Sequence, residues 1–184
     1  MIDEKEFPVI ETKRLVLDRI TTENQYTLFK YWSDEIVTKY MNIVPIKTID
    51  EVKSMISFFN ELFYKNEAVR WGIFRKEDNL LIGTCGFNSG LQEDSFIGRI
   101  GCDLYHEFWG KGFMKEALQN LIDYGFENFG VTRIEAYAMK ENVNSERLLN
   151  KLGFTREGLL REHGIYKGEL HDEYIFSVLK KEWK

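Results

Sequence analysis

The alternation of apolar and polar residues predicts a strand followed by one long amphipathic helix between residues 97 and 126. Two rows of apolar side chains recur there at i, i+4 spacing, Phe113, Ala117, Leu121 and Met114, Leu118, Ile122. Such rows indicate a helix with one buried face. The strand Ile97–Leu104 is apolar but contains Gly98 and Gly101. Glycine inside a strand indicates a bulge or the close approach of another backbone.

The first third of the chain reads as one strand followed by helices. Residues 11–20 alternate well enough for a strand, residues 34–40 suit a short helix, and a longer helix ends near Tyr64. Capping boxes predict the start of two helices, at Thr22 with Gln25 and at Thr48 with Glu51.

Strands dominate the remainder of the chain. Residues 68–75 and 80–87 flank a polar four-residue segment that suits a hairpin turn. Gly130 ends the long helix as a C-cap residue. A strand, a short helix and two further strands then follow, in residues 131–139, 142–152 and 154–179. This order predicts an α/β fold with a mixed sheet, and we expect residues 1–184 to form one domain.

Composition narrows the class of protein. The chain has 25 basic and 30 acidic side chains, a net charge of −5 and no basic block, whereas nucleic-acid binding needs a concentrated positive face. No apolar run approaches the ~20 residues of a membrane span, and the N-terminal segment lacks the basic and apolar regions of a signal peptide. Cys85 and Cys102 have neither metal-ligand nor disulfide spacing. Each lies inside an apolar strand, so both are expected to be buried structural thiols. We therefore expect no metal, nucleic-acid or membrane partner, and a cytoplasmic protein.

A glycine loop leads into the long helix and is a candidate anion site. Gly110 and Gly112 allow the backbone to turn sharply and to approach a ligand without a Cβ in the way. The first N–H groups of a helix have no partner within it, and the helix dipole places partial positive charge there. Two glycines are also what an ordinary tight strand-to-helix turn requires, so both interpretations stay open.

Residues 140–154 form the second informative stretch. Asn142 and Ser145 stand at a strand-to-helix transition, where such side chains cap free N–H groups. The alternative to a functional role is an ordinary N-cap, followed by Leu148, Leu149 and Leu152 packing inward.

Together the two stretches resemble the GNAT superfamily of acetyl-CoA-dependent N-acetyltransferases. The pyrophosphate loop of that family reads Gln/Arg-x-x-Gly-x-Gly/Ala and falls here on Trp109–Met114. Trp109 replaces the first residue and Met114 the small last residue, whereas Gly112 is retained. Several segments are similar to the branch of ribosomal-protein N-terminal acetyltransferases, namely Glu11–Leu17, Trp109–Gly112 with Glu116-Ala117, Asn142-x-x-Ser145 with Lys151–Phe154, and Glu157–Arg161 with Gly168 and Asp172.

The resemblance implies a fold and a way of holding acetyl-CoA. The fold is a mixed, mostly antiparallel, splayed sheet of seven strands, flanked by about four helices. Acetyl-CoA lies in the gap beside the central strand, where its pantetheine amides pair with the backbone of Cys102, Asp103 and Leu104. Its pyrophosphate meets the backbone N–H groups of Gly110, Lys111, Gly112, Phe113, Met114 and Lys115, and Trp109 belongs to the same cofactor-binding loop. Because main-chain donors need no particular side chain, Trp109 is compatible with this role.

The resemblance also implies roles in the chemistry. Asn142 hydrogen-bonds the pantetheine arm, and Ser145 lies near the sulfur. Many family members use as acid a tyrosine seven residues after the asparagine, and that position is Leu149 here. Ser145 is the substitute in the ribosomal-protein branch, so we expect it to be the catalytic proton donor or thiolate partner. The general base stays open between Glu135, Tyr137, Glu162 and His163, or a water chain that needs no dedicated base.

The implied activity is transfer of an acetyl group to a primary amine by direct attack on the thioester. The acceptor is a protein N-terminus, a polyamine, an aminoglycoside or another small amine. We expect it between the N-terminal helices and the tail, where aromatic residues gather, Trp32, Tyr40, Phe58, Phe59, Phe63, Trp71 and Tyr166. The alternatives are a non-catalytic acyl-CoA-binding or sensing module and a nucleotide-binding α/β protein, although Gly-x-Gly-x-x-Gly and Gly-x-x-x-x-Gly-Lys-Ser/Thr motifs are absent. A monomer or homodimer is expected.

Overall fold

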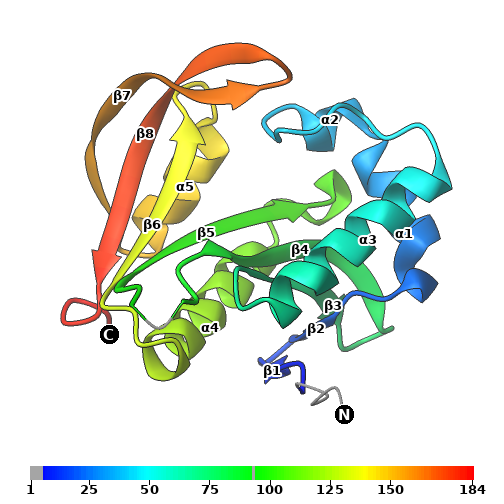
Figure 1. Cartoon of the computed structure of the whole chain (residues 1–184), viewed down its shortest axis with the longest axis horizontal. Helices are drawn as coiled ribbons and strands as arrows, with labels where there is room; N and C mark the ends of the chain where they lie inside the picture. The colour runs from blue at the N-terminus through cyan, green and yellow to red at the C-terminus, as the bar shows by residue number, and fades with distance from the viewer. Residues whose placement is uncertain (1–5, 93) are drawn as a thin grey trace.

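A computed structural model describes residues 6–92 and 94–184 and shows a single twisted sheet with helices packed against it (Figure 1). The strand order is β1-β2-β3-β4-β5-β6-β8-β7. The strands are β1 (Ile10–Glu11), β2 (Leu15–Arg19), β3 (Val69–Arg75), β4 (Leu80–Ser89), β5 (Ile97–Leu104), β6 (Arg133–Met139), β7 (Thr155–Tyr166) and β8 (Glu169–Leu179). The helices are α1 (Gln25–Trp32), α2 (Glu35–Thr38), α3 (Ile49–Tyr64), α4 (Phe113–Asn128) and α5 (Val143–Lys151).

The sheet is mixed and mostly antiparallel, as expected from the sequence. Neighbouring strands run antiparallel everywhere except at β5 and β6, which are parallel. Parallel neighbours need a long crossover connection, and α4 lies in that connection (Figure 1). The central strand β5 and the long helix α4 therefore follow one another in the chain at the place where strand pairing changes from antiparallel to parallel.

The expected first strand is two strands, which gives eight strands rather than seven in the part of the chain that the structure describes. Thr12 lies in the turn that separates β1 from β2. Its N–H donates to the Leu15 carbonyl at 2.9 Å, and its hydroxyl oxygen accepts from the Leu15 N–H at 2.9 Å. These bonds close a tight turn, so that residues 10–19 form a small hairpin of β1 and β2.

The start of the first helix also differs from the prediction. Residues 22–24 form a 3₁₀ turn, and α1 begins only at Gln25. The cap is one residue earlier than expected, because the Thr21 N–H donates to the Asn24 side-chain oxygen at 2.9 Å. By contrast, Thr48 caps α3 with Glu51 as predicted, and α4 begins at Phe113, the first residue of its predicted apolar rows, and runs to Asn128.

The long helix α4 packs on the sheet through the predicted face. Its apolar rows are buried, and it contacts β2, β4 and β5. Gly125 permits the closest approach, since a Cβ there would lie 2.3 Å from the ring of Phe87 on β4. The helix is therefore held at a fixed distance and orientation relative to the central strands.

A cluster of hydrogen bonds fastens the β1–β2 turn to the first turn of α4. Glu116 accepts from the Thr12 hydroxyl at 2.6 Å, from the Arg14 N–H at 2.7 Å and from Arg14 Nε at 2.7 Å. Arg14 Nη1 also donates to the Lys111 carbonyl at 3.1 Å. The loop that enters α4 is thus held by residues about a hundred positions earlier in the chain.

Two negative findings apply to the described residues. None of their helices is long and apolar enough to cross a membrane. Within the same residues, no group of three or more His, Cys, Asp or Glu side chains is arranged to hold a metal ion.

We expect Glu116→Gln to reduce the free energy of unfolding at pH 7. Hydrogen bonds to charged groups contribute about 1.5–3 kcal/mol, and we expect the lower end because Arg14 is partly exposed. Burial alone raises the pKa of the Glu116 carboxyl, but hydrogen bonds from Thr12 and Arg14 bring the pKa below its ordinary value. Its stabilising effect is therefore present above the unfolded pKa of about 4.3 and is lost as the pH falls through the lower folded pKa.

Urea unfolding of the wild type and the variant at several pH values measures this difference. The gap between the two should close below about pH 4. Glu127→Gln, an exposed glutamate on the same helix, is the control and should change little. A gap that stays constant with pH would contradict the role assigned to the carboxylate.

Candidate active site

The parallel strands β5 and β6 separate halfway along their length. Their pairing runs from Ile97 opposite Arg133 to Ile100 opposite Ala136 and then stops. Beyond this point each strand keeps its outer neighbour: β5 pairs with β4 as far as Leu104, and β6 pairs with β8 as far as Met139. The facing edges of the two strands are therefore unpaired over their last residues (Figure 1).

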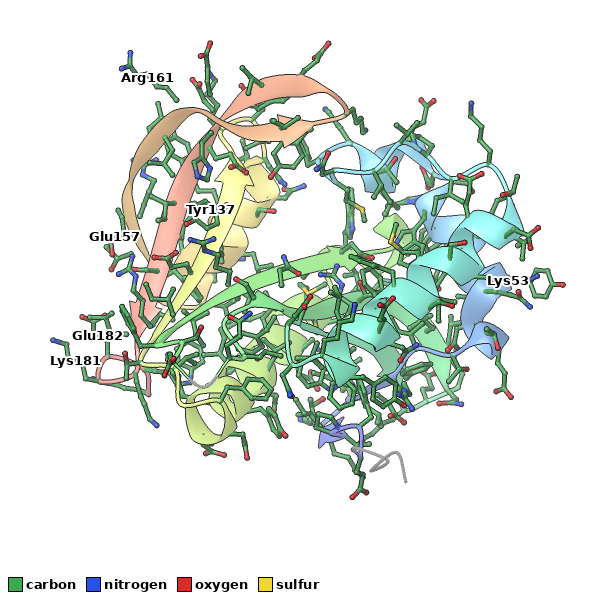
Figure 2. The ribbon with its side chains drawn as sticks, in the orientation of Figure 1. Lys53, Tyr137, Glu157, Arg161, Lys181 and Glu182 are labelled. Carbon is green, nitrogen blue, oxygen red and sulfur yellow. The ribbon has the colours of Figure 1, made fainter. Side chains whose placement is uncertain are left out.

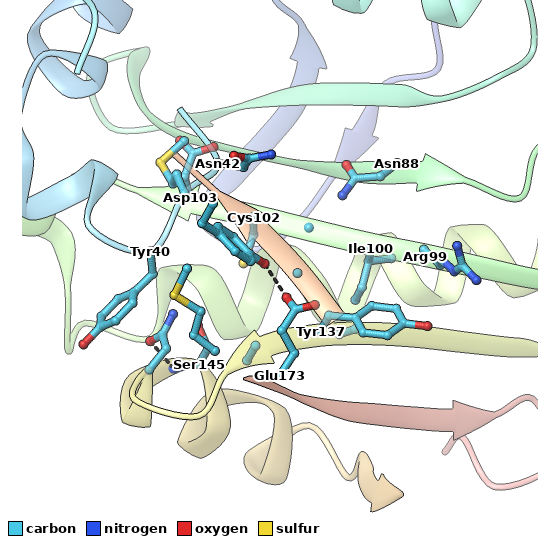
Figure 3. Close-up of a pocket in the computed structure, with 18 of the residues that line it drawn as sticks. Tyr40, Asn42, Asn88, Arg99, Ile100, Cys102, Asp103, Tyr137, Ser145 and Glu173 are labelled. Atoms are coloured by element: carbon cyan, nitrogen blue, oxygen red, sulfur yellow. Dashed lines mark hydrogen bonds between the residues drawn. The ribbon is translucent and has the colours of Figure 1, made fainter. Parts of the chain in front are cut away.

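A cavity of about 630 Å³ occupies this wedge. Cys102 and Asp103 of β5 line it on one side, and residues 137–139 of β6 line it on the other. Asn142 also contributes to its wall, as does Ser145 (Figure 3). Of the three β5 residues expected beside the ligand, Leu104 is the exception: it is buried, it does not line the cavity, and its carbonyl accepts from Trp109 Nε1 at 2.7 Å.

The loop before α4 has the conformation that an anion-binding turn requires. Gly110 and Gly112 have φ angles of 73° and 78°, in the left-handed region that favours glycine. Among the described residues, no acceptor is bonded to the backbone N–H groups of the loop and first turn, Gly110, Lys111, Gly112, Phe113, Met114 and Lys115. The donors at the start of α4 are therefore free for a ligand.

The side chains around these donors leave them accessible. Met114, the residue that departs most from the family's loop pattern, is only 8% exposed and packs in the core. Phe113 is also buried, and the Arg14 guanidinium lies over its ring at 4.4 Å. Lys111 and Lys115 are exposed, and Trp109 is partly exposed and tied back to the Leu104 carbonyl.

Asn142 and Ser145 form the N-cap of α5 and also line the cavity. The side-chain oxygen of Asn142 accepts from the Ser145 N–H at 3.2 Å, so the predicted N-cap is confirmed. Both residues also line the cavity, together with Leu149. The cap uses the Asn142 oxygen and leaves its NH₂ group as a donor. The start of α5 therefore presents a hydroxyl and an amide to the wedge.

The two cysteines have different environments. Cys85 is buried in β4, as predicted. The prediction that Cys102 is a buried structural thiol is wrong, because it is exposed and lines the cavity. The apolar sequence around Cys102 suggested a strand covered by neighbours, but β6 has already separated from β5 at this position.

The four candidate bases differ in their hydrogen bonds and in their position relative to the cavity. Glu135 is buried and accepts from Arg133 at 2.8 Å and from Tyr137 at 2.9 Å. Burial alone raises the pKa of Glu135, but these hydrogen bonds bring the pKa below its ordinary value, which makes it a weak base. Glu162 does not line the cavity, whereas His163 and Tyr137 do.

Two buried carboxylates in the cavity wall were not identified as side-chain sites from the sequence. Asp103 was expected to act through its backbone, yet its side chain forms an ion pair with Arg70 at 2.6 Å and accepts from the Thr84 hydroxyl. Glu173, in β8, is 3% exposed and is bonded to His163 and Tyr166. The alternation of residues along a strand could have shown which face of the sheet each carboxylate occupies. It does not show which residues each carboxylate bonds to.

The seven aromatic residues named from the sequence have different positions in the structure. Trp32, Tyr40, Phe59 and Tyr166 line the cavity. Three others do not: Phe58 is exposed, and Phe63 and Trp71 are buried in the core away from it.

Comparison with known proteins identifies the family. Residues 14–155, more than half of the chain, match the acetyltransferase (GNAT) domain family. The chain is 46% identical over 172 residues to an uncharacterized N-acetyltransferase, p20, of Bacillus licheniformis, covering 94% of this chain and 96% of that protein. It is 26% identical over 131 residues to the [ribosomal protein uS5]-alanine N-acetyltransferase of Escherichia coli, covering 71% and 68% of the two chains.

Among solved structures, the chain resembles the microcin C7 self-immunity acetyltransferase MccE in complex with acetyl-CoA and AMP. The TM-score is 0.81 with 23% identity, over 91% of this chain and 93% of that one. The splayed β5–β6 pair, the free donors at the start of α4 and these matches lead to one conclusion: the chain belongs to the GNAT family of N-acetyltransferases.

Proposed function

We propose that this protein transfers an acetyl group from acetyl-CoA to a primary amine, either a protein N-terminus or a small amine. The observation that carries the proposal is the unpaired edge of β5 beside a cavity of about 630 Å³. Backbone groups removed from water without partners are costly, so such an edge favours a ligand that pairs with it. The pantetheine arm of acetyl-CoA, an extended chain with two amides, suits this edge in the manner of an added strand.

The residues present fit the rest of acetyl-CoA as well. The free N–H groups of residues 110–115 suit a pyrophosphate, which needs several donors and a positive helix end. Arg14 neutralises Glu116, the one carboxylate in the first turn of α4, so the helix end keeps its positive potential. The NH₂ group of Asn142 is placed to donate to the pantetheine arm. On β5, the backbone groups of Cys102 and Asp103 form the unpaired edge. The Leu104 carbonyl already accepts a hydrogen bond from Trp109 Nε1.

Acetyl-CoA supplies a thioester whose carbonyl carbon is the electrophile. The chain must then hold a neutral amine near this carbon, stabilise negative charge on the carbonyl oxygen and give a proton to the departing sulfur. Unpaired N–H groups of β5 are suited to the second task. Ser145, which lines the cavity, is assigned the third task in place of the tyrosine that Leu149 replaces.

An acceptor screen tests the function directly. The protein is mixed with acetyl-CoA and a panel of N-terminal peptides, polyamines, aminoglycosides and simple amines, and free thiol is followed with time. Amine-dependent thiol release is the expected result. Tight CoA binding without release by any acceptor would instead support a non-catalytic acyl-CoA-binding module.

We expect Gly112→Ala to weaken CoA binding by about tenfold. A Cβ at φ 78° costs about 1–2 kcal/mol, and relief of this strain would turn the loop donors away from the phosphates. Gly130→Ala is the matched control, because Gly130 follows the other end of α4 with φ 69°. Calorimetry with CoA should show a loss only for the first variant. Equal affinities would refute the proposed pyrophosphate site.

We expect Ser145→Ala to lower kcat by about 10²-fold while leaving CoA affinity nearly unchanged, because the hydroxyl serves proton transfer and not binding. Ser54→Ala, at an exposed position on α3, serves as control. Steady-state thiol release and calorimetry on the same samples separate the two effects. A wild-type rate in the first variant would remove Ser145 from the mechanism.

A further inference from the structure

A bulge in β7 sets the position of His163. The pairing of β7 with β8 shifts between Leu160 and Gly164, so residues 161–163 form an irregular segment. Glu162 has φ 51°, and its N–H donates to the Asp172 carboxylate at 3.0 Å. Bulges re-aim side chains and are frequent beside active sites. Here the bulge brings His163 onto Glu173 of the neighbouring strand.

The contact with Glu173 fixes the tautomer of His163. His163 Nδ1 lies 2.8 Å from Glu173 Oε2, and the Tyr166 hydroxyl donates to Oε1. An ionised carboxylate only accepts hydrogen bonds, so Nδ1 carries a proton and Nε2 keeps a lone pair. No polar atom is bonded to Nε2 within residues 6–92 and 94–184.

Gly164 makes this arrangement possible. A Cβ at residue 164 would lie 2.7 Å from the Glu173 carboxyl carbon and 2.5 Å from the Tyr166 ring. Any other residue would therefore push the carboxylate away from its two donors. The cluster of His163, Glu173 and Tyr166 therefore depends on a glycine at position 164 of the β7–β8 hairpin.

The histidine ring lies between the active-site cavity and a second cleft. His163, Glu173 and Tyr166 line the cavity, where Figure 3 shows Glu173 projecting between Ser145 and Tyr137. The His163 ring stacks on Tyr137, with centroids 5.2 Å apart and planes 13° apart. His163 also lines a cleft of about 670 Å³ with Arg161, which Figure 2 shows at the outer side of β7.

We propose that His163 is the general base of the acetyl transfer and that Glu173 is its positioning residue. This inference rests on the proposed function. Nε2 accepts a proton from the ammonium form of the acceptor, and the buried carboxylate stabilises the imidazolium. The amine nitrogen then bonds to the carbonyl carbon as the carbon–sulfur bond breaks, and the sulfur takes a proton from Ser145. The amide nitrogen loses its second proton to Ser145, and the imidazolium releases its proton through the outer cleft, one proton per turnover.

The electrostatic surroundings of His163 come from four strands. Glu173 and Asp172 belong to β8, and Arg161, Glu162 and Tyr166 to β7. Tyr137 faces the ring from β6, and Arg99 of β5 lies over Tyr137 at 5.7 Å. Glu173 makes the direct contact with the ring nitrogen and is 3% exposed, so it is the group that orients the His163 ring.

The test follows thiol release from acetyl-CoA with an active amine between about pH 6 and 9. The wild-type rate should rise with pH, because the attack needs a neutral amine and an unprotonated base. In His163→Gln we expect kcat to fall about 100-fold at pH 7, the histidine-dependent rise to disappear and CoA affinity to stay unchanged. Added imidazole should restore part of the rate to His163→Ala. In Glu173→Gln the rise should move to lower pH, because the imidazolium loses its carboxylate.

His171→Gln, the same substitution in the same hairpin at a residue that does not line the cavity, should retain the wild-type rate and pH profile. If the wild type is active and His163→Gln keeps the wild-type rate and pH profile, the inference is overturned while the proposed function stands. A matching loss of CoA affinity in that variant would show a structural role and overturn it too. If the wild type releases no thiol with any acceptor, the proposed function fails and the inference falls with it.

Discussion

The structure depends on the point where β5 and β6 stop pairing. Four residue pairs join the two strands, from Ile97–Arg133 to Ile100–Ala136, and past them each strand is bound only to its outer neighbour. A parallel pair that closed fully would leave no space for a ligand in the middle of the sheet. The separation instead leaves backbone donors and acceptors beside a cavity, and such groups need partners when they are removed from water. Affinity for an extended, amide-bearing molecule thus follows from the main chain alone.

The two halves of the sheet are held apart by features outside the wedge. On one side, α4 is fixed against β2, β4 and β5, and its first turn is fastened to the β1–β2 turn through Glu116. On the other side, β8 holds β6 to its last residue, and β7 covers β8. Because these contacts do not involve the facing edges, the wedge is preformed, and binding need not first break strand pairing.

Local patterns in the sequence predicted the parts of the site that are close together in the chain. The i, i+4 rows predicted α4 and its first residue, the two glycines predicted the loop before it, and Asn142 was identified as a cap. Contacts between distant residues could not be obtained in this way. Glu116 meets Arg14 across 102 positions, and Cys102 is exposed because β6, 31 or more positions away, turns aside. Alternation reports which face of a strand a residue occupies, but not which partner it meets there.

The same distinction applies to the charges. The net charge of −5 fits a cationic acceptor but does not identify one, and the carboxylates in and beside the cavity already have partners. Asp103 is paired with Arg70 and Glu135 with Arg133, and the Glu173 carboxylate is hydrogen-bonded to His163 and Tyr166. A protonated amine that enters the cavity meets carboxylates that already have partners, so its ammonium form gains little there. This favours loss of the proton, which is what attack on a thioester requires, and it makes a base with a free lone pair more useful than another carboxylate.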